Sequence, residues 1–122
     1  MKKQIVKKSK IEIEIGLNED KHPESIHWKS DDNPEGQNYT ECKAMMLVLF
    51  DKEYKDTFKI DLWTTEMQVA EMDRFIFQHL KSLTDTYFRA TGNNKLASEM
   101  QMFVDYFGKE TGILQDVEEP QL

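Results

Sequence analysis

The chain has 122 residues and a mass of 14.4 kDa, a size that suits one domain. Charged residues make up 32% and hydrophobic residues 39% of the chain, which is the usual balance of a soluble protein. The formal net charge of −7 argues against a nucleic-acid-binding protein and against binding to an anionic membrane surface.

The charge is distributed unevenly along the chain. The first ten residues hold five lysines and no acid, which leaves 11 basic and 23 acidic residues in the rest. We interpret residues 1–8 as a basic flexible arm, 9–114 as a single α+β domain and 115–122 as an acidic flexible tail. Such an arm could contact phosphate, but a solubilising terminus is the simpler interpretation.

Apolar runs and cysteine content indicate the compartment. The sequence contains no run of about 20 apolar residues and no apolar run of signal-peptide type after its first residues. Cys42 is the single cysteine, so an internal disulfide is impossible, which fits a reducing compartment. We therefore expect a cytoplasmic protein with no direct membrane insertion.

Alternating apolar and polar residues predict strands in the first half of the chain. Residues 11–17 alternate isoleucine or leucine with glutamate and glycine, and residues 25–29 alternate in the same way. We expect these two strands to pair as a hairpin. Residues 30–41 are polar and contain proline and glycine, so they read as one long loop.

Residues 44–50, AMMLVLF, are apolar on both faces, so the pattern fits a strand or a short helix. We favour a strand, because the run is short and a tight connection leads to residues 57–63. In that second segment Phe58, Ile60 and Leu62 alternate with polar residues and Trp63, which again predicts a strand with one apolar face.

The apolar period then changes to that of a helix. A long helix is predicted over about residues 66–91, with an apolar stripe at Val69, Met72, Ile76, Leu80, Leu83 and Tyr87. Thr65 and Gln68 have the spacing of a capping box, and Gly92 is a suitable stop. A second helix is predicted over about residues 94–111, with Asn94 as its cap.

The order of these elements predicts the fold class. Strands come first and helices last, which is typical of an α+β fold. We expect an antiparallel sheet of about four strands, followed by a C-terminal two-helix hairpin that packs on one face of the sheet.

No residue pattern indicates catalysis or a bound cofactor. Cys42 could pair only with His22, His27 or His79, no nucleophile signature surrounds it, and none of these histidines has the spacing of a metal site. The five glycines form no phosphate-binding loop. A ligand pocket between the long helix and the sheet, with Asp61, His79 or Arg89 converging, is the least supported alternative. We expect a protein that is not an enzyme, with no metal, cofactor or small-molecule substrate.

Apolar residues on the uncovered face of the predicted sheet say more about function than any catalytic pattern does. With two helices on one sheet face, we expect Met45, Leu47, Leu49 and Trp63 to project from the other face. Exposed clusters of this kind mark interfaces, and methionine and tryptophan suit such surfaces. We predict that these four residues form a protein interface, with a homodimer as the most economical partner. Alternatively, residues 30–41 or a curled sheet cover them.

Four short strings of residues carry a resemblance to a known family. They are Asp61-Leu62-Trp63-Thr64, followed by Met67, Val69, Glu71 and Met72; Gln78-His79-Leu80; Arg89-Ala90-Thr91; and Asp105-Tyr106-Phe107. Over about residues 10–108 the chain resembles the GldC family of gliding-motility-associated proteins. The resemblance brings no catalytic residue. It implies a non-enzymatic accessory protein of bacterial gliding, acting through protein–protein contacts with a partner in the gliding apparatus.

A second function remains open. Small acidic proteins with strands, then two helices, and an apolar sheet face also occur as export chaperones of the SecB type. The alternative is therefore a chaperone or adaptor that holds unfolded secretion clients.

Overall fold

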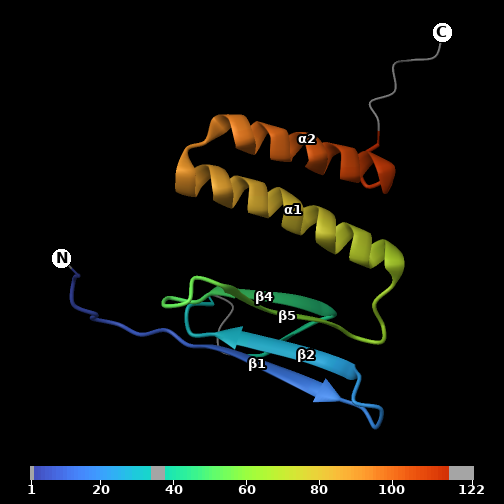
Figure 1. Ribbon diagram of the computed structural model, residues 1–122. Coiled ribbons are helices and arrows are strands. Elements are labelled where there is room, and N and C mark those ends of the chain that lie inside the picture. Colours follow the sequence, from blue (N-terminus) through green and yellow to red (C-terminus); the bar gives the residue numbers. More distant parts are fainter. Residues whose placement is uncertain (1, 34–37, 116–122) are drawn as a thin grey trace. The chain divides into compact units, whose positions relative to one another are not determined.

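The computed structural model describes residues 2–33 and 38–115. The chain forms two compact units, Met1–Met67 and Gln68–Leu122. Within these described residues, the first unit holds five strands and the second holds two helices. Strands precede helices along the chain (Figure 1), so the α+β class and this order are confirmed. The division into an arm, one domain and a tail stays a prediction, and residues 116–122 of the predicted tail lie outside the described residues.

The first sheet is antiparallel and has three strands in the order β1-β2-β3. Its strands are β1 (Ile11–Leu17), β2 (Pro23–Ser30) and β3 (Thr40–Cys42). The turn between β1 and β2 is built on Asn18, whose side-chain oxygen accepts the backbone N–H groups of Asp20 and His22 at 2.8 and 3.1 Å. The predicted hairpin is therefore confirmed. In its middle strand Ile26 is fully buried, between Ile15 on β1 and Cys42 on β3.

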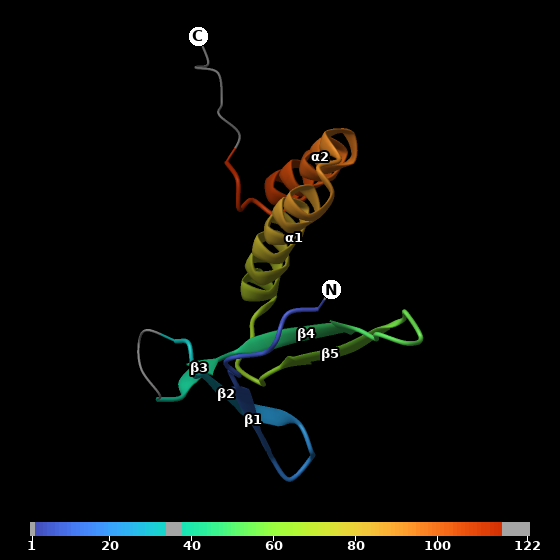
Figure 2. The ribbon, with the colours of Figure 1, turned by 90° about the vertical axis from the view of Figure 1, so that its left-hand side faces the viewer.

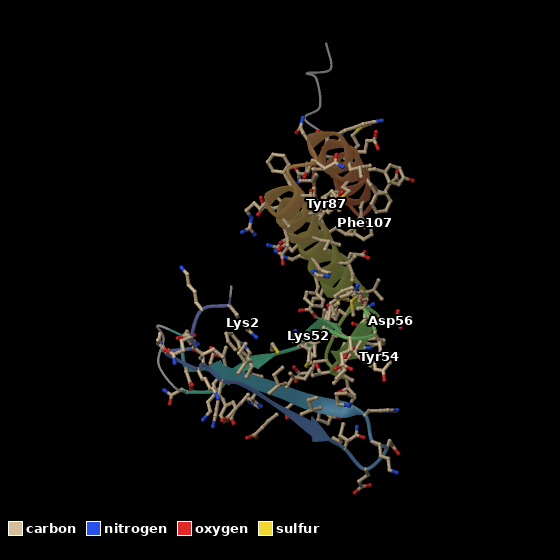
Figure 3. The ribbon with its side chains drawn as sticks, turned by 60° about the vertical axis from the view of Figure 1, so that its left-hand side comes forward. Lys2, Lys52, Tyr54, Asp56, Tyr87 and Phe107 are labelled. Carbon is tan, nitrogen blue, oxygen red and sulfur yellow. The ribbon has the colours of Figure 1, made fainter. Side chains whose placement is uncertain are left out.

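The second sheet is the hairpin of β4 (Ala44–Phe50) and β5 (Thr57–Trp63). Residues 44–50 are thus a strand and not a short helix. The turn that joins the strands is organised by Asp51, whose carboxylate accepts the backbone N–H groups of Glu53 and Tyr54 at 3.0 and 2.7 Å. Figure 3 labels Lys52, Tyr54 and Asp56 at this tip. This polar turn sets the register of the hairpin, that is, which residue of β4 pairs with which residue of β5.

The two sheets meet where β3 runs into β4. Figure 2 shows β3 leading into β4. Only Lys43 separates these strands, and its carbonyl accepts the backbone N–H of Thr64 at 2.8 Å. The carbonyl of Pro23 accepts the N–H of Thr65 at 3.2 Å. These bonds hold the end of β5 beside the start of β2. Strand β3 was not predicted and lies at the end of the segment that reads as a loop. Its three residues are too few to show an alternating pattern.

The helical unit contains α1 (Val69–Thr91) and α2 (Asn94–Glu110), which lie side by side (Figure 1). Gly92, at a φ of 68°, ends α1 in the left-handed conformation, as predicted. The predicted helix hairpin is confirmed. That it packs on a face of the sheet stays a prediction.

The start of α1 differs from the predicted capping box. Gln68 is the N-cap, and its backbone N–H donates to the Glu71 side chain at 3.1 Å. Thr65 does not cap the helix, because its hydroxyl donates to Glu24 of β2 at 3.1 Å and holds it at the end of the strand unit. Likewise Asn93, and not Asn94, caps α2.

Small side chains allow the two helices to approach closely. The buried residues of the hairpin are Phe77, Thr84, Ala97, Val104 and Gly108. A Cβ atom added to Gly108 would lie 2.7 Å from the ring of Phe77 and 2.7 Å from Leu114. Gly108 therefore allows the aromatic ring of α1 to lie against the backbone of α2.

Candidate functional site

The register of β4 and β5 defines one wholly apolar face. Directly opposed residues of an antiparallel pair point to the same side of the sheet. Three such pairs here consist of large apolar residues: Met45 with Leu62, Leu47 with Ile60, and Leu49 with Phe58. We call these six residues the hairpin apolar face. It holds three of the four residues that the sequence predicts to form an interface.

Trp63, the fourth predicted interface residue, lies on the opposite face. It is paired with Ala44, and the same face continues through Met46 with Asp61 and Val48 with Lys59. The prediction that Trp63 shares a face with Met45, Leu47 and Leu49 is therefore wrong. Alternation within each strand is visible in the sequence, but the pairing between strands is set by the turn, and a slip of one residue exchanges the faces.

Several side chains of the hairpin apolar face are accessible. The exposed fraction is 56% for Leu49, 63% for Phe58 and 49% for Ile60, whereas Met45, Leu47 and Leu62 are partly buried. Accessible apolar side chains gathered on one face are typical of protein interaction sites. The alternative, in which residues 30–41 cover them, falls partly on residues 34–37, which lie outside the described residues. The interface role of these residues thus stays a prediction.

The candidate nucleophile is in a poor setting for catalysis. Cys42 ends β3, opposite Ile26, and is partly buried. Burial raises the pKa of its thiol, and the nearby charge of Glu41 acts in the same direction. Because the thiolate is the reactive form, a raised pKa makes Cys42 less nucleophilic at neutral pH.

The histidines and the candidate ligand residues belong to different elements. His27 lies on β2 opposite Glu14 of β1 and Glu41 of β3, and His22 lies in the β1–β2 turn. Within residues 2–33 and 38–115, no three histidine, cysteine or acidic side chains gather closely enough to hold a metal ion. His79 and Arg89 belong to α1, where Arg89 donates to Asp85 at 2.9 Å.

A pocket that the sequence analysis did not predict lies at the end of β5. It has a volume of about 360 Å³ and is lined by His22, Pro23, Asp61, Leu62, Trp63, Thr64 and Thr65. We call it the Asp61 pocket. The string Asp61-Leu62-Trp63-Thr64, which carries the family resemblance, supplies four of its lining residues. What the string could not show is that the end of β5 meets the start of β2.

The helices of the described part of the chain include none that is both long and apolar enough to cross a membrane. The longer helix, α1, carries Glu71, Asp73, Arg74, Lys81 and Asp85 along its length.

Comparison with known families identifies the chain's relatives. The family model described as gliding motility-associated protein GldC-like matches residues 23–113. The match spans β2 to β5 and both helices, while β1 lies before it. Comparisons with curated proteins and with solved structures found no match. The resemblance drawn from the sequence is confirmed.

Proposed function

The chain belongs to the GldC-like family of gliding motility-associated proteins, and on that basis we propose that it is a non-enzymatic, cytoplasmic accessory protein of the gliding apparatus that acts through protein–protein contacts. The family supplies the association with gliding motility. The observation that carries the proposed mechanism is the hairpin apolar face, where six large apolar side chains are paired across two strands.

The composition of this face suits a protein partner. None of its six residues carries a charge or a polar side chain, so burial would leave no side-chain hydrogen bond unmade. Each large apolar side chain that leaves water on association contributes about 1.5–3 kcal/mol at most. Leu49, Phe58 and Ile60 are the most exposed of the six, so they would bury the most additional apolar area on association.

A second copy of the chain is the partner that we propose first. In a twofold dimer the same surface meets itself, so a charged face would bring like charges together. The hairpin apolar face avoids this penalty because it is neutral. A dimer would present two copies of every other surface to the gliding apparatus.

The test is a gliding assay with a paired set of variants. In a gliding bacterium whose motility depends on this chain, Leu49→Thr combined with Phe58→Thr should abolish colony spreading, because both changes keep strand-forming residues but remove the apolar surface. The control is Val48→Thr with Phe50→Thr, the neighbouring positions on the other face of β4. Normal spreading by the first variant, with the protein present at wild-type level, would contradict the proposal.

The alternative function, a chaperone or adaptor for unfolded secretion clients, is favoured by the open edge of β5. In the described part of the chain β5 pairs only with β4, so its other edge offers unpaired backbone groups beside the apolar face. An extended client could pair with this edge. Micromolar binding of unrelated unfolded peptides, insensitive to their sequence, would support the alternative, and binding restricted to one folded partner would oppose it.

A further inference from the structure

We infer that the Asp61 pocket binds a cationic side chain, lysine or arginine, presented by a partner protein. This inference rests on the proposed function, since it gives the protein partner a basic anchoring residue. The pocket's charged and aromatic groups, Asp61 and Trp63, lie on the opposite side of β5 from the hairpin apolar face, although Leu62 of that face also lines the pocket.

Backbone hydrogen bonds hold the walls of the pocket in place. The N–H of Thr64 donates to the carbonyl of Lys43, and the N–H of Thr65 donates to the carbonyl of Pro23. The Thr65 hydroxyl also donates to Glu24 at 3.1 Å. The residues that follow β5 are therefore tied to Lys43, between β3 and β4, and to the start of β2, and the pocket is formed before any ligand arrives.

Two oxygen atoms of the pocket residues lack donors. Thr64 is only 4% exposed, and its hydroxyl oxygen has no hydrogen-bond partner among the described residues. The same holds for the buried Oδ1 atom of Asp61. Buried acceptors without donors are costly, so a group that brings N–H donors is favoured here once a side-chain rotation turns either oxygen toward the pocket. The ammonium of lysine has three donors and the guanidinium of arginine has five.

Charge and shape favour a cation over other ligands. The Asp61 carboxylate repels anions, and an apolar side chain would leave both oxygens without donors. Trp63, which is 57% exposed, offers an indole face of the kind that attracts cations. The volume of about 360 Å³ lies at the lower end of the roughly 300–1,000 Å³ of ligand pockets, which suits one side chain. The net charge of −7 also attracts basic partners.

Within the chain, Lys59 competes with an incoming cation for the Asp61 carboxylate. Its Nζ atom lies 2.8 Å from Oδ2 of Asp61, which leaves Oδ1 without a donor. Rotation about the terminal bond of an aspartate side chain is easy and exchanges the two oxygens. An incoming cation therefore competes with Lys59 for one carboxylate, and removal of Lys59 should strengthen binding.

The experiment is a fluorescence titration in a Trp28→Phe background, in which Trp63 is the remaining tryptophan. The probe is N-acetyl-arginine amide, and the matched control is the neutral N-acetyl-citrulline amide, both at constant ionic strength. We expect a saturable change in Trp63 fluorescence with the arginine compound alone. An equal response to both compounds would overturn the inference.

Variants then assign the response to the pocket. Asp61→Asn should weaken arginine binding about tenfold or more, because a charge-assisted hydrogen bond is lost. Lys59→Gln should strengthen binding, and Glu66→Gln, which removes a nearby negative charge at an exposed position, should leave it within about twofold. Circular dichroism is the check that each variant is folded. Unchanged affinity in a folded Asp61→Asn protein, or weaker binding in Lys59→Gln, would contradict the inference.

The outcome is separable from that of the proposed function. If arginine fails to bind while the Leu49 and Phe58 variant abolishes gliding, the pocket assignment is wrong and the proposed function stands. If arginine binds as expected while that variant glides normally, the proposed function is wrong and the pocket is real.

Discussion

Leu49 lies directly opposite Phe58 across the β4–β5 hairpin, and both side chains are more than half exposed. A cross-strand pair of this kind stabilises a hairpin by about 0.2–1 kcal/mol. Exposure of this size leaves much of each side chain in water. The pair is therefore better placed to contribute to association than to the stability of the unit itself.

The first prediction concerns the stability of the variant that tests the interface. Leu49→Thr with Phe58→Thr should lower the free energy of unfolding by no more than about 1–2 kcal/mol, because the two side chains are already largely exposed and lose mainly their mutual contact. Urea denaturation at a low protein concentration, where a dimer contributes least, measures this value. A loss above about 4 kcal/mol would show that the pair belongs to a core.

The close approach of α1 and α2 predicts a strong effect at Gly108. Gly108→Ala should destabilise the helical hairpin by about 1–3 kcal/mol, since the new methyl group would overlap the Phe77 ring and Leu114. Thermal or urea unfolding followed by circular dichroism measures the change. The control adds Phe77→Leu to Gly108→Ala, and a smaller loss than the sum of the single variants is expected because these positions touch. Strict additivity would contradict the contact.

The observed N-cap of α1 can be tested against the one predicted from sequence. Glu71→Ala should cost about 0.5–2 kcal/mol, because it removes the side chain that accepts the Gln68 N–H. Far-ultraviolet circular dichroism during thermal unfolding measures the loss. Glu99→Ala, at an exposed position on α2, is the control and should be nearly neutral. Equal effects of the two substitutions would argue against the capping box.

The thiol of Cys42 should react slowly in the folded protein. Burial raises its pKa, so at a pH below that value the thiolate fraction is smaller than for a free cysteine, and it rises only as the pH is increased. Alkylation by iodoacetamide at pH 7.5, followed by mass spectrometry, should be slower than for a short cysteine peptide. Denaturation in urea should restore the peptide rate. Fast alkylation of the folded chain would contradict the burial of Cys42.

Much of the fold was predictable because several segments have a clear apolar period. The alternation at residues 11–17 and 57–63 and the helical period after residue 68 each depend on one element alone. The strand at Ala44–Phe50 followed from its length and its distance to β5. Local turn chemistry such as that of Gly92 was also visible, because it depends on the conformation of one residue.

Features that depend on two distant segments were not predictable. The face of Trp63 follows from its pairing with Ala44, which the six-residue turn between β4 and β5 decides. The position of Thr65 follows from its bonds to Pro23 and Glu24 of β2. Because Thr65 is held there, Gln68 and not Thr65 is the N-cap of α1. The Asp61 pocket has the same origin, since one wall comes from β2 and the other from β5.

The central claim is that this chain works by burying the hairpin apolar face against another polypeptide. The partner that we propose first is a second copy of the same chain. Sedimentation equilibrium of the purified chain measures this directly. We predict a mass of twice 14.4 kDa for the native chain and of 14.4 kDa for the folded Leu49→Thr, Phe58→Thr variant. A native chain that remains at 14.4 kDa at every concentration, or a variant that dimerises like the native chain, would contradict the account.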